Sequence, residues 1–597
     1  MNRRNLVKTI IAGTSGILVG KTYATDNIRS IIPPEKEKDL QSTNTLSAMS
    51  LKLAEYDGAK YIGRCPDIDT LRKVIPQFPN QKIDVVSFYA TDTLKSSGGG
   101  EFYAVKSTDL KEKNGIVVRV NEDWCWIRLE SVSTNIWPLE WLGIRIGSPQ
   151  YGALNAKILQ ESIVNNYRVE LVFPSGMTYL QPGVVKIPGN WAGVLRGSNT
   201  RNCIIRPSEN PDDPNIILIE YNTEKKFSWG LRIENLSFDG MNYTLSAIRL
   251  ANVGYVYTNN LQIYSFNGCN LWLDKVQDSV FEATNIQDGG YSSGDPSDNT
   301  KTTHPALLLT STIKNDACNM IRFNNCQIEN NKCSPYIRII SGIGLMFNQT
   351  HAEIRDKAMW GKRDFMEIAN ADVQISEHAG SRFRNAVLIN GYGRTTISGG
   401  RGLGGDLTVR AEGKRGTLAL SNCLVGNINL SAYNGNHQFS NVVAANVVLK
   451  NTAGSLRWFG GSMNALVVEG SVNPALGAHF DGVLVTQDVT FSDPKDTPQL
   501  SHSFINSTVL GNMAFNCING VYYANSIAGN EILGKRLRIA IPGNVRTMYG
   551  TAAPTSGTYS QGDRVINSAP AAGGWDGWRC VAAGTPGVWK GYGKIAD

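Results

Sequence analysis

The sequence predicts an all-β fold, a parallel β-helix with a small β-rich head before it and a small β module after it. The main observation is a residue that recurs at nearly constant spacing. Asn235, Asn260 and Asn285 lie 25 residues apart, and each begins a short segment in which apolar and polar residues alternate. A repeat of about 20 to 50 residues indicates stacked coils, because one coil alone cannot bury its apolar face.

The composition agrees with many short strands joined by turns. The 597 residues include 60 Gly, and 42% of them are hydrophobic, with many β-branched side chains. The net charge of +7 is modest, and no Lys/Arg run forms a nucleic-acid patch, so nucleic-acid binding is not expected. Six His lack metal-ligand spacing, so neither a metal nor a cofactor is expected. The ten Cys contain no CxxC pair and are expected to be buried, reduced thiols.

The amino terminus permits two interpretations. In segment 1–24, Arg3 and Arg4 precede an apolar stretch that ends near Gly20, which resembles a twin-arginine export signal. The stretch is too short to span a membrane. The alternative is an arm that attaches the protein to a larger particle. Residues 25–56 are polar and contain Pro33-Pro34 and a charge cluster, which is typical of a linker.

A β-rich head is expected at 57–147. It contains alternating segments at 83–89 and 116–120, a triple-glycine turn at 98–100 followed by Glu-Phe, and a Trp-rich strand at 124–129. Region 148–170 holds the one convincing helical pattern, at 153–165, whose apolar residues recur at helical spacing. We expect this helix to cap the open first coil of the β-helix.

The β-helix itself is predicted over 171–540. In its later half, six strands that each begin with Asp or Asn recur at intervals of 18 to 24 residues, from Asp406 through Asn427 and Asn446 to Asn512. Asn suits a coil corner because it tolerates the left-handed backbone region, and its amide can hydrogen-bond to the Asn stacked above. Stacked coils lie about 4.8 Å apart.

The tail, 541–597, is rich in Gly, Pro and Trp and predicts a compact β module. Its motifs are GDRV, GWRC and GTPGVWKG. Trp575, Trp578 and Trp589 are expected to form its core, and the alternative is a platform on which sugar rings stack.

The order of these parts resembles the tailspike proteins of bacteriophages and prophages. The resemblance rests on the head with its GGG-Glu-Phe turn, the capping helix, the strand and turn VELVFPSG, the β-helix and the terminal motifs. It implies a right-handed β-helix, a homotrimer joined in part by the terminal module, and attachment to a phage tail or baseplate through the amino-terminal region. It also implies that the protein acts outside the cell, on a capsular or other bacterial surface polysaccharide.

A catalytic motif must be found in the repeat. The segments FNNCQIE, FNQTHAE and ADVQISE begin 24 residues apart and align Glu329, Glu353 and Glu377. Three stacked carboxylates repel one another, which raises the pKa of at least one. An acid beside an ionised carboxylate is what glycoside hydrolysis requires. We expect Glu353 to be the general acid, with Glu329 or Glu377 as its partner; the alternative is three glutamates that simply face water.

Adjacent rungs would place the carboxyls about 5 Å apart, as in retaining glycosidases, whereas alternate rungs would place them near 10 Å, at the long end of inverting geometry. His351 and Arg355 flank Glu353, and Arg338 follows Glu329. These three side chains are candidates for binding an acidic sugar.

An excursion from the coil supplies further candidates. Asn285 and Asn325 are 40 residues apart, so about 15 residues leave the repeat just before Glu329. Such an excursion forms either a groove wall or a plain surface loop. It adds Asp288, Asp295 and Asp298 as candidate acids, and Tyr291 as a ring that stacks on sugar.

The sequence therefore predicts a depolymerase that cleaves a bacterial capsular polysaccharide endolytically, by hydrolysis. One alternative is a lyase on a uronate-containing glycan, with His351 or Tyr291 as base. Another is a glycan-binding spike or adhesin without enzymatic activity. Whether the groove lies within one subunit or between two stays open.

Overall fold

The computed structural model describes residues 51–597 except 56, 91–97, 167, 223–225, 314–315, 401, 411–415, 432–434, 451–454, 470–476, 493–501, 517–520, 525–526 and 534–546. The expected export or attachment segment, 1–24, and nearly all of the expected linker lie outside the described residues. The chain forms two compact units, which are Met1–Leu129 and Glu130–Asp597.

The first unit is a five-stranded sheet with strand order β1-β2-β3-β5-β4. Its elements are α2 (Ala59–Ile62), β1 (Arg64–Cys65), α3 (Ile68–Leu71), β2 (Lys82–Ser87), β3 (Gly98–Lys106), β4 (Val117–Arg119) and β5 (Trp124–Arg128). Alternate residues of β2 point into the unit, and Ile83 and Val85 are buried there with Phe102 and Trp126. The period-2 pattern of the sequence thus places one face of this sheet on the core.

A buried arginine explains the triple glycine. The Arg128 side chain donates hydrogen bonds to the carbonyls of Gly98, Gly99 and Gly115 at 2.6–2.9 Å, and its guanidinium stacks over Phe102. A Cβ at Gly99 would lie 2.3 Å from the carbonyl oxygen of Val86. The expected turn at 98–100 was wrong, because these glycines begin β3 and allow the close backbone approach.

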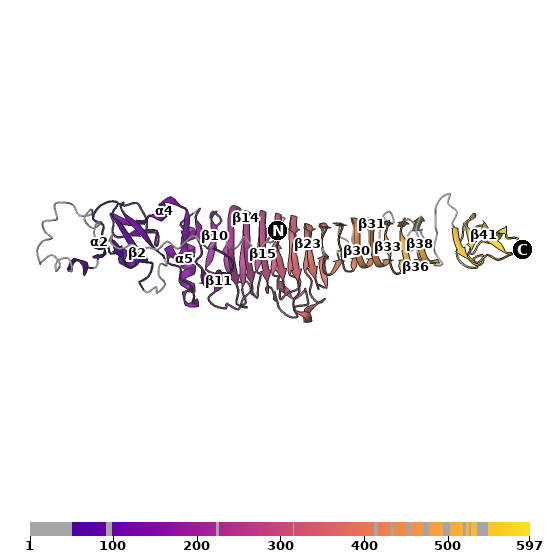
Figure 1. The fold of residues 1–597 in the computed structure, drawn as a ribbon, viewed down its shortest axis with the longest axis horizontal. Coiled ribbons are helices and arrows are strands. Elements are labelled where there is room, and N and C mark those ends of the chain that lie inside the picture. Colours follow the sequence, from indigo (N-terminus) through magenta and orange to yellow (C-terminus); the bar gives the residue numbers. More distant parts are fainter. Residues whose placement is uncertain are drawn as a thin grey trace, which may run out of the picture. The chain divides into compact units, whose positions relative to one another are not determined.

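The second unit is a parallel β-helix. In the described part of the chain, 31 strands form one continuous sheet, and the strands of successive coils follow one another in a row (Figure 1). Three faces recur in every coil. Face A contains β7, β10, β19, β26 and β28; face B contains β8, β11, β20, β22 and β24; face C contains β9, β12, β18, β25, β27 and β29. The long strands bend from one face to the next.

The elements of this unit are as follows, in chain order. Before the coils come α4 (Glu130–Ser133), β6 (Ile136–Pro138), η2 (Leu139–Leu142), η3 (Pro149–Tyr151) and α5 (Gly152–Val164). The early coils comprise β7 (Glu170–Val172), β8 (Gly176–Leu180), β9 (Val185–Ile187), β10 (Val194–Arg196), β11 (Cys203–Pro207), β12 (Ile217–Tyr221), β13 (Ser228–Asp239), β14 (Ser246–Tyr264) and β15 (Leu271–Gln287). The middle coils comprise β18 (Leu307–Thr310), β19 (Cys318–Asn324), β20 (Gln327–Glu329), β21 (Ile337–Asn348), β22 (His351–Glu353), β23 (Met366–Ser376), β24 (Ala379–Ser381), β25 (Asn385–Ile389), β26 (Gly393–Ser398), β27 (Asp406–Val409), β28 (Gly416–Ser421) and β29 (Ile428–Ser431). The late coils comprise β30 (Asn436–Lys450), β31 (Ser455–Glu469), β32 (Ala478–Asp481), β33 (Leu484–Val485), β34 (Val489–Ser492), β35 (His502–Ile505), β36 (Thr508–Asn516), β37 (Val521–Ala524) and β38 (Ile527–Leu533).

The interior is filled by residues stacked in register from coil to coil. On face A, Phe281, Phe323 and Phe347 are paired neighbours, with ring centroids 4.9 and 4.7 Å apart and nearly parallel planes. All three are buried. Each coil completes the burial of the one below it, which is why the repeat is needed for stability.

The asparagine corner exists, but its register differs from the expected one. Asn235 and Asn260 both have positive φ, and Asn260 Nδ2 donates to Asn235 Oδ1 at 2.9 Å, as predicted. Asn285 was wrongly placed in this column. It pairs with Gln262 inside a strand, and the corner of that coil is Ala283, with φ 47°.

The capping helix and the first coils are joined by specific contacts. α5 begins one residue before the predicted helix and packs on β8 and β9. Its buried Asn155 donates to the carbonyls of Arg145 and Tyr179. The Gln160 side chain bonds both backbone groups of Lys186, in β9. Side chains of the helix thus form hydrogen bonds with backbone groups that an open first coil would otherwise expose.

The last sheet is four-stranded, with order β39 (Thr547–Gly550), β40 (Arg564–Asn567), β41 (Trp575–Ala582) and β42 (Val588–Lys594). Its tryptophans do not form a closed core: Trp575 is 43% exposed, and Trp578 and Trp589 are only half-buried. The expected tryptophan core was wrong, because so small a sheet cannot enclose three indoles.

The expected burial of the cysteine side chains is confirmed for the described residues. The nine described cysteines are free and buried, and burial raises the pKa of the Cys326 thiol to about 12. Among the described residues, no group of three or more His, Cys, Asp or Glu is arranged to hold a metal ion. No helix in the described part of the chain is long and apolar enough to cross a membrane.

Candidate active site on face B

Two of the three predicted glutamates are direct neighbours. Glu329 ends β20 and Glu353 ends β22, and the two strands pair in parallel register, with Glu329 opposite Glu353. Paired residues of adjacent strands lie about 4.8 Å apart. The two carboxylates therefore start from adjacent rungs of face B, as the sequence predicts.

Glu377 does not join them. Glu353 is paired with Ser381 in the next coil, and Glu377 lies at the corner before that strand, with φ 51°. Its carboxylate accepts a hydrogen bond from Gln349 at 2.7 Å. The prediction of a three-carboxylate ladder was wrong, because Phe347 pairs with Ile375 rather than with Ala371, which shifts the third segment by four residues.

Two basic side chains and an amide contact the Glu329 carboxylate. His351 Nδ1 lies 2.6 Å from Glu329 Oε1, and Arg355 forms an ion pair with Oε2. Gln287, on the coil below, also donates to Oε2. Glu329 is buried, whereas the His351 and Arg355 side chains are about half exposed. The carboxylate is therefore covered by its own hydrogen-bond partners, of which the His351 ring is half exposed.

Glu353 reaches solvent beside an aromatic ring. Its side chain is 28% exposed, and Arg382 Nη1 contacts its Oε1 at 2.7 Å. The Arg382 guanidinium stacks over the Trp360 ring, 4.2 Å from the centroid, and the Trp360 indole donates to the Ile354 carbonyl. Trp360 is 39% exposed. Its position suits stacking on a sugar ring.

Arg382 and Trp360 were not among the residues predicted from the sequence. Both lie outside strands, and Arg382 follows Glu353 by 29 residues, so only the coil geometry brings them together. The signal that could have found Trp360 is an isolated Trp in a polar turn directly after the candidate acid.

Two excursions leave the helix between face B and face C next to these carboxylates. One runs from 288 to 306 and contains the antiparallel pair β16 (Tyr291–Ser292) and β17 (Thr302–His304). The other runs from 354 to 365 and contains the short helix η4 (Lys357–Met359). They follow the strands β15 and β22, which lie on either side of β20. The long excursion that the sequence predicts is therefore real.

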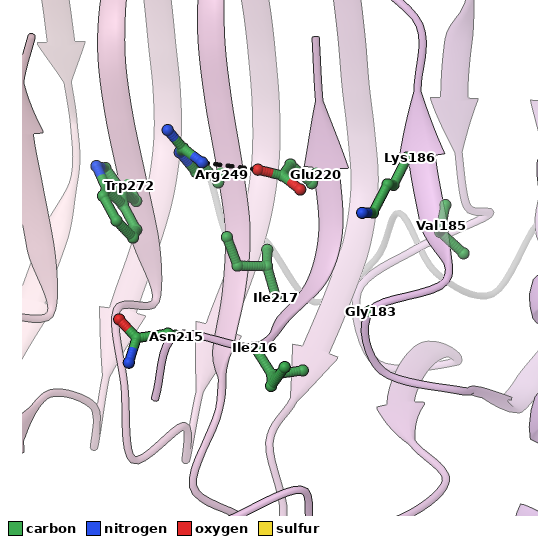
Figure 2. A pocket seen from close by; sticks show the side chains of 9 residues that line it. All are labelled: Gly183, Val185, Lys186, Asn215, Ile216, Ile217, Glu220, Arg249 and Trp272. Carbon is green, nitrogen blue, oxygen red and sulfur yellow. Dashed lines mark hydrogen bonds and ion pairs between the residues drawn. The ribbon is translucent and has the colours of Figure 1, made fainter. Parts of the chain in front are cut away.

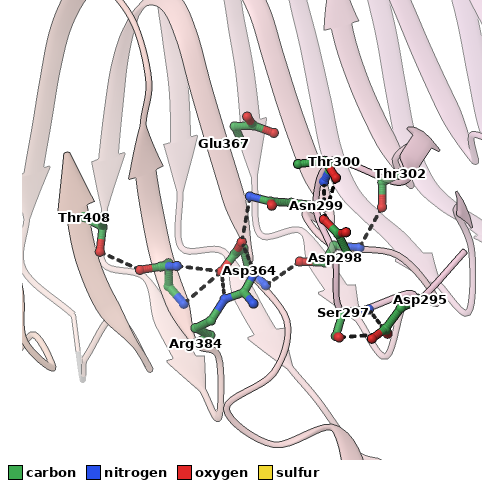
Figure 3. Close-up of polar contacts among 12 residues, drawn as sticks. Asp295, Ser297, Asp298, Asn299, Thr300, Thr302, Asp364, Glu367, Arg384 and Thr408 are labelled. Atoms are coloured by element: carbon green, nitrogen blue, oxygen red, sulfur yellow. Dashed lines mark hydrogen bonds and ion pairs between the residues drawn. The ribbon is translucent and has the colours of Figure 1, made fainter. Parts of the chain in front are cut away.

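The first excursion is fixed by polar contacts to the second excursion and to β21 (Figure 3). Asn299 Nδ2 donates to the fully buried Asp364 carboxylate at 3.2 Å. Asp364 also accepts two hydrogen bonds from Arg384 and one from the Asn385 amide. Arg338 donates to the carbonyls of Asn299 and Thr302. A loop held at so many points is a fixed wall rather than a loose surface segment.

The other candidate residues are occupied by local contacts. Asp295 and Asp298 accept hydrogen bonds from Ser297 and Thr300 of their own loop, and these bonds lower the pKa of both carboxyls. Asp288 accepts a bond from Asn330 at 2.6 Å. Tyr291 pairs with His304 within the loop. Asp295 and Asp298 are therefore better explained as residues that stabilise the loop than as general acids.

Arg338 is likewise committed to structure. Besides the two loop carbonyls, its Nε donates to Glu367 at 2.8 Å on face C. Of the predicted residues, the structure therefore gathers four: Glu329, Glu353, His351 and Arg355. A pair of carboxylates with two arginines, a histidine and an exposed indole can hold an anionic sugar and act on its glycosidic bond.

A protein-family model matches the strands of the first unit. Residues 64–131 match the family model described as the phage tail protein small four-stranded beta-sheet domain. The matched segment contains all five strands of the head. The match confirms the resemblance to phage tail proteins that the sequence indicates.

Three solved tailspike structures are similar to the chain. The chain is similar to the gp42 tailspike of Acinetobacter phage vb_AbaP_AS12, with 12% identity over 85% of this chain and 82% of the other and a TM-score of 0.40. It is similar to the tailspike gp49 of Acinetobacter baumannii bacteriophage Fri1, a capsular polysaccharide depolymerase, with 11% identity, coverage of 82% and 70%, and a TM-score of 0.34. Tailspike protein 4 of bacteriophage CBA120 shows 14% identity over 73% of this chain and 55% of its own, with a TM-score of 0.35.

Proposed function

We propose that the protein is a phage tailspike depolymerase that binds a bacterial surface polysaccharide, such as a capsule, and cleaves it endolytically at face B. The observation that carries the proposal is the register of Glu329 and Glu353 on adjacent rungs, beside two fixed excursions. The two carboxylates project from adjacent rungs of one face, and each is paired with an arginine, Arg355 for Glu329 and Arg382 for Glu353. The phage tail domain at 64–131 supports the setting.

Hydrolysis is the reaction we favour. Glu353 is the partly exposed carboxyl and acts as general acid, giving its proton to the glycosidic oxygen as that bond breaks. Glu329 is the partner carboxylate, and the rung spacing of about 4.8 Å is near the separation of about 5–5.5 Å in retaining glycosidases. Trp360 stacks on the sugar, and Arg355 and Arg382 bind acidic substituents.

A lyase is the second candidate, and one observation favours it. Glu329 holds the Nδ1 side of His351, which leaves Nε2 toward solvent as a base. His351 would remove the proton at C5 of a uronate while the bond to the 4-oxygen breaks, which leaves a C4–C5 double bond in the product. Arg355 and Arg382 would neutralise the uronate carboxylate. Tyr291 is the less favoured base because it pairs within its loop.

Digestion of a panel of purified capsules tests both reactions. Hydrolysis releases reducing ends without new ultraviolet absorbance, whereas elimination produces absorbance near 235 nm. We expect Glu353→Gln to lower kcat at least about 100-fold. Glu377→Gln is the matched control and should retain activity, because its carboxylate lies at the corner. Full activity in both Glu353→Gln and Glu329→Gln would reject the site, and binding without any cleavage would favour an adhesin.

We further propose that the protein is a homotrimer attached to the phage tail or baseplate through its amino-terminal region. The phage tail domain supports this placement in the virion, with action outside the cell. Trimerisation is the role we assign to the terminal module. Light scattering of the whole chain and of a variant ending before residue 541 tests it: a monomeric full-length protein would contradict the proposal.

A further inference from the structure

A pocket on face C lies in the early coils, away from the strands that carry Glu329 and Glu353. Its volume is about 330 Å³, within the range of about 300–1,000 Å³ typical of small-ligand sites. It is lined by residues of β9, β12, β14 and β15 and of the turns before them (Figure 2). The lining residues are Gly183, Val185, Lys186, Asn215, Ile216, Ile217, Glu220, Arg249 and Trp272.

The pocket wall is preorganised around Arg249. Its guanidinium contacts Glu220 at 2.8 Å and the buried Asp274 at 2.7 Å, and it stacks over the Trp272 ring at 4.7 Å. Asp274 is fixed in turn by the backbone N–H of Thr312. These side chains therefore need no rearrangement to bind a ligand, which lowers the entropic cost of binding.

The wall also has more donors than acceptors. Arg249 Nε and Trp272 Nε1 are buried and make no hydrogen bond with any described residue. Buried donors without a partner are uncommon and call for an explanation. Both atoms are enclosed in the wall, and their unpaired N–H groups favour negatively charged and oxygen-rich atoms in the pocket beside them.

Lys186 supplies an available positive charge. It is exposed, and its backbone is fixed by the Gln160 side chain of α5. Lys186 lies opposite Glu220 in the strand register, yet it forms no ion pair with any residue that the structure describes. Since Arg249 is already paired with two carboxylates, Lys186 is the cation of the pocket that remains for an anion.

We infer that this pocket binds a single carboxylated pyranose, such as a uronate residue of the glycan. Trp272 offers an aromatic edge, Glu220 and Asn215 offer acceptors for hydroxyls, and Lys186 pairs with the carboxylate. The inference rests on the proposed function only in that it takes the ligand from the same glycan. The pocket is a second, non-catalytic contact that holds the polymer on another face.

Binding of a monosaccharide probe tests the pocket independently of cleavage. Saturation-transfer NMR titrations of the full chain would use methyl glucuronoside and the uncharged methyl glucoside. We expect saturable binding of the glucuronoside with a Kd of about 1 mM, and at least about tenfold weaker binding of the glucoside. Lys186→Glu should weaken glucuronoside binding at least about tenfold. Lys226→Glu, at another exposed lysine, is the control and should leave it unchanged.

The outcomes separate this inference from the proposed active site. Glu353→Gln should abolish turnover and leave glucuronoside binding intact, and Lys186→Glu should do the reverse on short soluble oligosaccharides. Absence of saturable binding would overturn the inference, as would equal binding of the two probes or unchanged binding in Lys186→Glu. Loss of binding in Glu353→Gln would place the probe on face B and also overturn it.

Discussion

His378 should make the stability of the β-helix depend on pH. It is fully buried beside Phe365, with ring centroids 5.1 Å apart, and burial lowers its pKa from the ordinary 6.5 to about 4. Burial is the largest cause of this lowered pKa; His351 also contributes to it, and a hydrogen bond of the ring to the Thr350 backbone partly opposes it. Neither ring nitrogen has a side-chain hydrogen-bond partner among the described residues. The native state thus holds this imidazole neutral.

The sign and size of the effect follow from linkage. Because the folded pKa lies below the unfolded one, the unfolded chain binds the extra proton between about pH 6.5 and 4, so stability is full above this window and falls as the pH decreases through it. A shift from 6.5 to about 4 corresponds to about 3.4 kcal/mol in total. Between pH 7 and pH 5 the free energy of unfolding should fall by about 1.8 kcal/mol from this group alone.

Guanidinium denaturation at pH 7 and pH 5 measures this loss of unfolding free energy. The wild type and His378→Leu share every other titrating group, so the difference between their two pH responses isolates His378. We expect the variant, whatever its absolute stability, to lose about 1.8 kcal/mol less than the wild type on acidification. If both proteins lose the same free energy, His378 is not held neutral in the native state and the reasoning is wrong.

Three further outcomes are expected. Asp364→Ala should cost about 2–3 kcal/mol in chemical denaturation, because it leaves the buried Asn385 amide and the partly exposed Arg384 without their partner, whereas Asp298→Ala should cost about 1 kcal/mol or less. Phe323→Ala should cost about 3–5 kcal/mol in the same assay, because the ring lies between two others in the stack; a cost below 1 kcal/mol would contradict the described packing. Trp360→Ala should raise KM for polysaccharide and leave the unfolding midpoint unchanged, and an unchanged KM would remove the ring from the site.

The fold could be predicted because a β-helix repeats its own chemistry. Alternating apolar residues and corner asparagines recur in every coil, so even an approximate period identifies the architecture. The register could not be predicted to the residue. The corner requires a left-handed backbone rather than an asparagine, and Ala283 adopts it while Asn285 lies in a strand. Counting from one asparagine to the next therefore placed the corner of this coil two residues too late.

The changing length of the coils also explains why only two of the three predicted glutamates are neighbours. From Phe323 to Phe347 a coil takes 24 residues, but from Phe347 to Ile375 it takes 28. The four additional residues belong to the coil that includes the 354–365 excursion, and they move Ser381 rather than Glu377 opposite Glu353. The pair Glu329 and Glu353 was predictable because the coil that joins them keeps the period. The contact of Arg382 with Glu353 was not predictable, because it depends on how far that excursion displaces the next coil.

These observations explain why the candidate site lies where the period breaks. Strands of a β-helix are nearly equivalent, so a regular coil offers only a flat wall, and a ligand groove needs chain that leaves the repeat. Both long excursions beside β20 and β22 leave between faces B and C, and one is anchored by Asp364 while the other carries Trp360. Anchoring matters as much as length, because a mobile loop would not hold a sugar in one orientation. If Asn299→Ala releases the first excursion, kcat/KM should fall while the distant pocket at Lys186 keeps its affinity for glucuronoside, and parallel losses at both places would instead indicate general unfolding.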